Sequence, residues 1–305
     1  MSKQEITTVH IHSITQLHQL LGIAKPKHPL FSLVRFEDFS RNEVTQRVRL
    51  ISDCYQITLK KDCPCKLQYG QTTYDFDEGV MSFFSPKQIN IVEPGGFLPT
   101  AGWLLTIHPD FLNGSLLANK IKCYGFFNYS VNEALILSDD EQNSLETIFG
   151  QLQKEIDLPI DTFSQDVILS HLDLLLTYCN RYYNRQFITR KTTSNDLLNR
   201  MERLLDEHFS KETTEKGIPT VSQLASLLNL SPKYLSDCLK QLTGQTALQH
   251  IHEKLIDKAK EKLASTELSV SEIAYHFGFE FPQSFSKLFK SKTSQTPLEY
   301  RQSVN

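Results

Sequence analysis

Between Phe31 and about Leu112 the apolar residues come in short runs rich in β-branched and aromatic side chains, separated by Gly, Pro and Asp. The runs are Phe31–Phe36, Val48–Leu59, Thr72–Phe76, Val80–Phe84, Ile89–Val92 and Trp103–Ile107. Many short strands at this spacing are typical of a small antiparallel barrel or jelly roll. We therefore expect an antiparallel β-barrel over residues 31–137, preceded by a loose polar arm over residues 1–30.

After His108 the spacing of apolar residues changes to that of helices. Ser138 and Glu141 have the three-residue spacing of a capping box, which predicts a helix from there to about Asp157. A second stripe over Thr162–Arg185 predicts another helix after Pro159. This helical hairpin (138–185) is either a dimer interface or a cover for the barrel, and the pattern favours neither.

Residues 186–194 are basic or hydroxyl-bearing with few apolar side chains, so we expect a linker between two domains there. Beyond residue 195 the pattern is one of short helices with clear starts. The spacing of a capping box recurs at Thr220 with Gln223, Thr246 with Gln249, and Ser269 with Glu272.

The last part of the chain also repeats itself. Val221, Leu224, Ala225 and Asn229 recur 49 residues later as Val270, Ile273, Ala274 and Gly278. Pro232, Leu235, Ser236, Leu239, Lys240, Thr243, Gln245, Thr246 and Leu248 recur 50 residues later as Pro282, Phe285, Ser286, Phe289, Lys290, Thr293, Gln295, Thr296 and Leu298. The extra residue falls in the turn, where an insertion does least harm.

Each repeat indicates a helix, a tight turn and a second helix. Asn229 and Gly278 are residue types that tolerate a positive φ, as such a turn requires. This is the helix-turn-helix plan, whose second helix enters the major groove. A long helix over about Ala247–Ala264 joins the two units and could hold them about 34 Å apart, one turn of B-DNA. The expected fold is α+β, with an N-terminal antiparallel barrel and helical hairpin and an all-α domain over residues 195–305.

These motifs resemble those of the AraC/XylS family of transcription regulators. The first unit runs from Thr220 through Leu224-Ala225 and Ser231-Pro232; the second runs from Ile273-Ala274 through Gly278-Phe279 to Thr296-Pro297. The N-terminal half resembles, more weakly, the cupin-like sensor domains joined to such units. Three residues depart from the family pattern: Ser294 replaces a usual Gly, Leu255 a frequent Arg, and Asp237 a basic or amide residue.

The resemblance implies a set of DNA-facing residues. Those implied to contact bases are Lys233, Ser236, Asp237, Gln283, Ser284, Ser286 and Lys287. Lysine can bond guanine, glutamine adenine and aspartate cytosine. Those implied to contact phosphates are Lys240, Lys290, Lys292 and Arg301. An alternative for any single lysine is an ordinary solvated helix surface.

The total charge of the chain does not indicate a nucleic-acid-binding protein. The chain has a net charge of −3, and residues 195–305 hold 14 cationic and 14 anionic side chains. A DNA-binding function must therefore rest on where charge is placed. After Phe281 there are four cations and one anion, which supplies a local basic face.

For the N-terminal half, a binding pocket fits better than a catalytic centre. The strand region offers only His108 as a histidine, so we expect no metal, no cofactor and no enzyme activity. Effector-binding candidates are Arg47, Arg49, Tyr74 and Trp103, with the two arginines on one strand face and suited to an anionic ligand. The alternative is that the aromatics are barrel core and the arginines face solvent.

Six scattered cysteines, no apolar run long enough to cross a membrane and no secretion signal indicate a cytoplasmic protein. We expect a DNA-binding transcription regulator that forms a homodimer and binds double-stranded DNA under control of a small-molecule effector. RNA polymerase is a further partner if the protein is an activator. Alternatives are a cupin-type metalloenzyme tethered to DNA and a redox sensor that uses Cys63 and Cys65.

Overall fold

The computed structural model describes residues 7–40, 46–61, 67–69, 72–74, 79–92, 99–189, 191–209 and 217–304. The chain divides into two compact units at the peptide bond between Gln186 and Phe187. Within the described residues, no helix is both long enough and apolar enough to span a bilayer.

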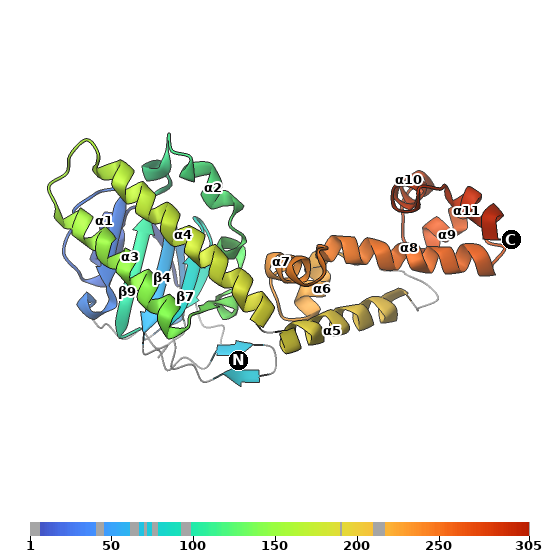
Figure 1. The fold of residues 1–305 in the computed structure, drawn as a ribbon, viewed down its shortest axis with the longest axis horizontal. Coiled ribbons are helices and arrows are strands. Elements are labelled where there is room, and N and C mark those ends of the chain that lie inside the picture. The colour runs from blue at the N-terminus through green and yellow to red at the C-terminus, as the bar shows by residue number, and fades with distance from the viewer. Residues whose placement is uncertain are drawn as a thin grey trace. The chain divides into compact units, whose positions relative to one another are not determined.

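A five-stranded sheet forms the centre of the first unit (Figure 1). Its strand order is β10 (Leu135–Ile136), β7 (Val80–Phe84), β4 (Tyr55–Lys61), β9 (Ala101–Ile107) and β2 (Phe31–Arg35). All neighbouring strands in this sheet are antiparallel. The strand prediction is therefore correct for β2, β7 and β9, although β9 begins two residues earlier than expected.

The remaining strands form separate sheets. One has the order β1 (Thr7–Ile11), β3 (Val48–Ser52) and β8 (Ile89–Val92), and another pairs β5 (Leu67–Tyr69) with β6 (Thr72–Tyr74). Because β1 pairs with β3 in parallel, the strand arrangement is not wholly antiparallel. The described strands form open sheets, so the prediction of a closed barrel does not hold for them. The physical reason is the break at Asp53, where the run Val48–Leu59 divides between two sheets.

The N-terminal segment belongs to the folded unit, unlike the loose arm that the sequence indicated. Ser13 caps the helix α1 (Ile14–Leu21), and its side chain accepts the backbone N–H of Gln16. Buried Ile11 and Leu17 pack with Phe36 and Leu104, so β1 and α1 contribute to a hydrophobic cluster with the five-stranded sheet.

Two long helices, α3 (Asp139–Asp157) and α4 (Ser164–Thr189), lie across the other face of the five-stranded sheet (Figure 1). Ser138 and Glu141 form the predicted capping box at the start of α3. The Trp103 indole stacks on Phe149 of α3 with ring centroids 5.9 Å apart, and Cys179 Sγ of α4 lies 3.8 Å from Met81 Sδ. The hairpin therefore covers the sheet with its inner side.

Shorter elements complete the first unit. They are the helix α2 (Leu117–Cys123) and the 3₁₀ turns η1 (Phe36–Asp38), η2 (Pro109–Leu112), η3 (Gly125–Asn128) and η4 (Val131–Glu133). The range 186–194, expected as a linker, contains the end of α4 at Thr189 and the start of the next helix at Lys191.

The described part of the second unit is helical (Figure 1). Its helices are α5 (Lys191–Phe209), α6 (Val221–Leu227), α7 (Pro232–Thr243), α8 (Ala247–Ser265), α9 (Val270–His276), α10 (Pro282–Thr293) and α11 (Pro297–Val304). α6 packs on α7 and α9 packs on α10, and both pairs contact α8. At 1.5 Å per residue, the 19 residues of α8 extend about 28 Å.

The helix starts and turns of this unit match the sequence prediction. Capping boxes form at Thr220, Thr246 and Ser269, each with the partner three residues later. Asn229 has a φ of 58° and Gly278 a φ of 79°, so both turns use the left-handed region. The apolar residues at helical spacing in the two helix pairs are nearly inaccessible and form the core of this unit: Leu224, Leu235, Leu239, Ile273, Phe277, Phe285 and Phe289.

Candidate nucleic-acid interface

The first turns of α7 present one of the two predicted base-facing edges. Lys233 Nζ lies 2.8 Å from Asp237 Oδ1, an ion pair one helical turn apart. Ser236, which lies between these two residues in the sequence, is half-buried. Because the lysine and the aspartate partly neutralise each other, this edge presents a polar surface with little net charge.

The start of α10 presents the second edge. Gln283, Ser284 and Lys287 are exposed, whereas Ser286 is half-buried and donates its hydroxyl to the Pro282 carbonyl at 3.1 Å. Three of the four predicted base-facing side chains on α10 therefore reach solvent. Within the described residues Lys287 forms no ion pair, so its charge is available to an outside acceptor.

The predicted phosphate contacts divide into two groups. Lys240, Lys290 and Lys292 are exposed, as a phosphate-binding lysine must be. Arg301 is held differently: its Nε donates to the Leu263 carbonyl at 3.1 Å and its Nη2 to the Leu268 carbonyl at 2.6 Å. Two nitrogens of the Arg301 guanidinium thus hold α11 against the end of α8, and its role as a phosphate contact stays a prediction.

One feature of this surface was missed from the sequence. Phe281 is the N-cap residue of α10, with 59 % of its surface exposed and no side-chain cap hydrogen bond. The repeat contained the signal, because the matching residue before the matching proline is Ser231, an ordinary hydroxyl cap of α7.

Two of the four predicted effector-binding residues, Trp103 and Arg49, lie on different sheets of the first unit. Trp103 is buried, with Phe149 stacked on its ring and the Arg35 guanidinium 4.4 Å from its centroid. Arg49 lies on β3 of the three-stranded sheet, in register with exposed Ile91. Trp103 is thus packed in the core of the first unit, as the alternative for the aromatic residues expected, and its role in effector binding stays a prediction. Arg47 lies just before β3, and the Tyr74 side chain is outside the described residues.

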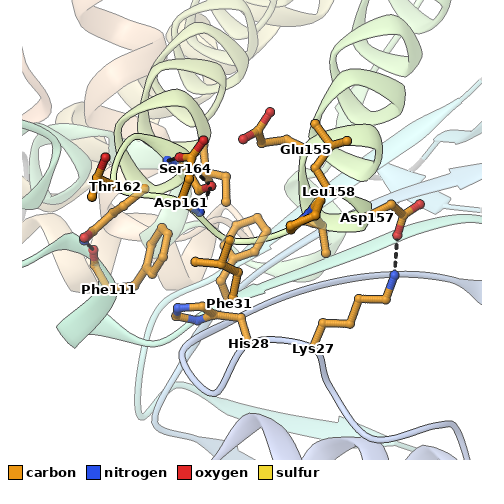
Figure 2. A pocket seen from close by; sticks show the side chains of 15 residues that line it. Lys27, His28, Phe31, Phe111, Glu155, Asp157, Leu158, Asp161, Thr162 and Ser164 are labelled. Carbon is orange, nitrogen blue, oxygen red and sulfur yellow. Dashed lines mark hydrogen bonds and ion pairs between the residues drawn. The ribbon is translucent and has the colours of Figure 1, made fainter.

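A different cavity, of about 590 Å³, opens in the first unit at the turn between α3 and α4 (Figure 2). Its apolar wall contains the buried rings of Phe31 and Phe111, whose centroids are 5.2 Å apart, and His28 meets Phe111 edge-on at 5.3 Å. Leu158 and Ile160 of the turn also line it. Its size falls within the range usual for small-molecule sites.

Acidic side chains dominate the polar part of this cavity (Figure 2). Lys27 Nζ contacts Asp157 Oδ1 at 2.6 Å, and this hydrogen bond lowers the pKa of Asp157. Backbone N–H groups and the Ser164 hydroxyl donate to Asp161 and lower its pKa, so both carboxyl groups are ionised at neutral pH. With Glu155 included, the residues that line the cavity carry three carboxylates and one lysine.

Burial lowers the pKa of His28 below its ordinary value of 6.5, so this imidazole is neutral at pH 7. Its Nδ1 accepts the backbone N–H of Leu30 at 3.1 Å. The proton of the neutral ring therefore lies on Nε2.

Metal and thiol chemistry find little support in the described residues. They contain no cluster of three or more His, Cys, Asp or Glu side chains that could hold a metal ion. Burial raises the pKa of Cys54 to about 11, and it raises that of Cys179 further. Cys63 and Cys65, the pair considered for a redox role, lie outside the described residues.

Comparisons with known proteins identify the C-terminal part. A family model described as a helix-turn-helix domain matches residues 224–303. An uncharacterized HTH-type transcriptional regulator, YisR of Bacillus subtilis, is 35 % identical over 103 residues, which are 34 % of each chain. The HTH-type transcriptional activator RhaS of Escherichia coli O157:H7 is 32 % identical over 152 residues, half of each chain.

This chain thus matches half or less of the length of these curated relatives. Among solved structures, the C-terminal domain of the two-component response regulator yesN from Fusobacterium nucleatum is 31 % identical, with a TM-score of 0.31. That match covers 35 % of this chain and 98 % of the other. The sequence motifs, the helical unit and the family match agree that residues 224–303 of this chain form a helix-turn-helix domain, similar in sequence to the transcriptional regulators YisR and RhaS.

Proposed function

We propose that the chain is a sequence-specific DNA-binding transcription regulator with two helix-turn-helix units, in which α7 and α10 enter successive major grooves. This proposal rests on the two helix pairs, α6 with α7 and α9 with α10, which both contact α8. Each pair has a left-handed turn and an exposed polar edge. A second helix of such a pair places its N-terminal residues against base edges.

The exposed residues divide into reading and positioning roles. Gln283 and Lys287 suit adenine and guanine, and Ser284 suits either. Lys240, Lys290 and Lys292 suit phosphates. The Lys233–Asp237 ion pair must open for either residue to contact a base, so α7 reads sequence less strongly than α10.

The direct test uses the full chain and a pool of random duplexes. We expect repeated selection to enrich one sequence motif with two parts about one helical turn apart. The variant Gln283→Ala, which leaves the helix core intact, is expected to enrich a motif degenerate at one position of the part that α10 reads. Enrichment of no motif would contradict the proposed function.

YisR is described as a transcriptional regulator and RhaS as a transcriptional activator. By this analogy we propose an activating role, with RNA polymerase as a further partner. Transcription from a promoter that carries the selected motif, with and without the protein, distinguishes activation from repression.

We propose that the cavity at the α3–α4 turn binds the effector. Its aromatic wall and its excess of carboxylates favour an organic cation over the anion that Arg47 and Arg49 had indicated. We expect phenethylamine to bind more tightly than 2-phenylethanol, its neutral counterpart. Glu155→Gln should reduce this preference, and equal affinities for the two probes would contradict the proposed ligand class.

We propose a homodimer formed through the outer side of α4. Phe163, just before the first residue of α4, and Val167 and Leu174 on the helix are exposed by 69 %, 37 % and 44 %, at the spacing of one helix face. Leu174→Glu is expected to yield monomers in sedimentation analysis with unchanged folding. Asn180→Glu, at an exposed position of the same helix about 120° around its axis from Leu174, tests the effect of added charge alone.

A metalloenzyme or a redox sensor remains the alternative function. Stoichiometric Fe, Mn or Zn in the purified protein would favour the enzyme. DNA binding that responds to peroxide in the parent chain, and not after replacement of Cys63 and Cys65 by Ser, would favour the sensor.

A further inference from the structure

Of the six helices from α6 to α11, all but one begin after a residue whose side chain caps the helix. α6, α7, α8, α9 and α11 each begin after a Ser or Thr whose hydroxyl accepts a backbone N–H. Only α10, among these six helices, begins after a residue that cannot accept: Phe281. A hydroxyl or carboxylate cap is strongly preferred at this position, so the phenylalanine is locally unfavourable.

The internal repeat makes the exception sharper. Ser231 and Phe281 precede the matching prolines Pro232 and Pro282 and occupy the same N-cap position. Ser231 is 8 % exposed and its Oγ accepts the Tyr234 N–H at 3.2 Å. Phe281 is 59 % exposed, and its ring stacks on no other aromatic ring among the described residues. The substitution thus gives up a cap without gaining a place in the core.

A residue that weakens its own helix and exposes a large apolar ring usually serves a function rather than the fold. Phe281 stands at the end of α10 that also presents Gln283, Ser284 and Lys287. In a helix-turn-helix unit this end meets the base edges. The apolar group that a base edge offers in the major groove is the C5-methyl group of thymine, and a phenyl ring is one of the side chains that contact it.

We propose that Phe281 reads a thymine by packing its ring on the C5-methyl group. This inference rests on the proposed DNA-binding function and adds a residue outside the polar set implied by the family resemblance. It also predicts that the two parts of the binding site differ. The α7 edge has a buried serine at the equivalent position, so only the part read by α10 contains this methyl-dependent thymine.

The test removes the methyl group and nothing else. The motif selected by the full chain is synthesised with each thymine in turn replaced by deoxyuridine, and affinity is measured for the parent and for Phe281→Ser. For the parent we expect one position at which deoxyuridine weakens binding about fourfold, the effect of leaving one methyl-sized group in water. For Phe281→Ser we expect equal affinity for thymine and deoxyuridine at that position.

Tyr275 provides a matched control. It is also 59 % exposed and lies in the same helix pair, but on α9 rather than α10. Tyr275→Ser should retain the full methyl dependence. Because Phe281→Ser restores the residue type found at the other helix starts, its folding is expected to be intact, and thermal unfolding of the same sample verifies this.

The outcomes distinguish failure of the thymine inference from failure of the proposed DNA-binding function. If the parent binds its motif but no thymine depends on its methyl group, or if the dependence persists in Phe281→Ser, the inference is overturned and the proposed function stands. If the parent enriches no motif at all, the proposed function fails and the inference fails with it.

Discussion

The backbones of Gly217 and Gly278 touch: a Cβ atom added to Gly278 would lie 2.3 Å from the Gly217 Cα atom. Non-bonded carbon atoms prefer separations of about 3.5–4.0 Å, so no other residue fits at position 278 without movement of the backbone. The segment that leads into α6 therefore rests directly on the turn between α9 and α10. Gly278 serves both a left-handed turn, with a φ of 79°, and this contact.

Gly278→Ala is expected to destabilise the second unit by about 2 kcal/mol or more, because the alanine must adopt a positive φ and also displace Gly217. Chemical denaturation measures the loss. Asn229→Ala, at the turn of the first helix pair, provides the comparison, because it alters a left-handed residue that is exposed. A smaller loss at 278 than at 229 would contradict the role given to the Gly217 contact.

Ser294→Gly is expected to stabilise the protein by about 1 kcal/mol. Ser294 ends α10 in the left-handed region with a φ of 63°, whereas the equivalent residue at the end of α7 is Gly244 with a φ of 79°. Glycine adopts this conformation without the steric cost that serine bears. The reverse change, Gly244→Ser, should lower the melting temperature. An unchanged melting temperature in both variants would show that neither residue bears strain.

Lys287→Ala and Lys290→Ala are expected to weaken DNA binding in different ways. Loss of Lys287, a proposed base contact, should cost about 1–3 kcal/mol and relax the preference at one position of the motif. Loss of Lys290, a proposed phosphate contact, should weaken binding to every sequence and reduce the slope of log K against log salt by about 1. Equal salt slopes for the parent and Lys290→Ala would contradict the phosphate assignment.

Arg301→Ala is expected to affect stability more than DNA affinity. The guanidinium group donates to the carbonyls of Leu263 and Leu268, which end α8 and begin the segment before α9. Loss of hydrogen bonds from a charged donor costs about 1.5–3 kcal/mol. The salt slope should remain that of the parent. A reduced salt slope of DNA binding with normal stability would instead support Arg301 as a phosphate contact.

Stability is expected to fall as the pH drops below 6.5. Burial, and then the charge of Lys292, lowers the pKa of His252 below 6.5, so the unfolded state binds a proton more readily than the folded state. Stability from this residue is therefore complete above pH 6.5 and is lost as the pH falls toward the pKa of the folded protein. Melting temperatures at pH 7.5 and 5.5 should differ less in His252→Gln than in the parent. A difference as large as that of the parent would show that His252 contributes nothing to it.

The sequence predicted the second unit closely because its signals are local. A capping box needs only residues such as Ser269 and Glu272, three positions apart, and a left-handed turn needs only one suitable residue such as Asn229. These features depend on nearby atoms, so they can be inferred without knowing which elements pack together.

The first unit was predicted less well because strand pairing depends on residues far apart in the chain. The pattern of the run Val48–Leu59 predicts strand throughout, yet the run divides at Asp53 between two sheets. Trp103 is a residue type that suits a pocket wall, but Phe149, which lies 46 positions later in the chain, stacks on its ring. The charge of Arg301 likewise suits a phosphate contact, and the sequence does not reveal the distant carbonyl to which it donates a hydrogen bond.

The continuous helix α8 has a consequence for how such a protein can diverge. Each residue of an α-helix turns the chain by about 100°, so one residue added to or removed from α8 would rotate one helix pair against the other by that angle. Its length of 19 residues can therefore change only in steps close to whole turns. Insertions and deletions should accumulate in the loops of this chain and spare its interior helix, whereas substitutions on the exposed edges of α7 and α10 remain free to alter which sequence is recognised.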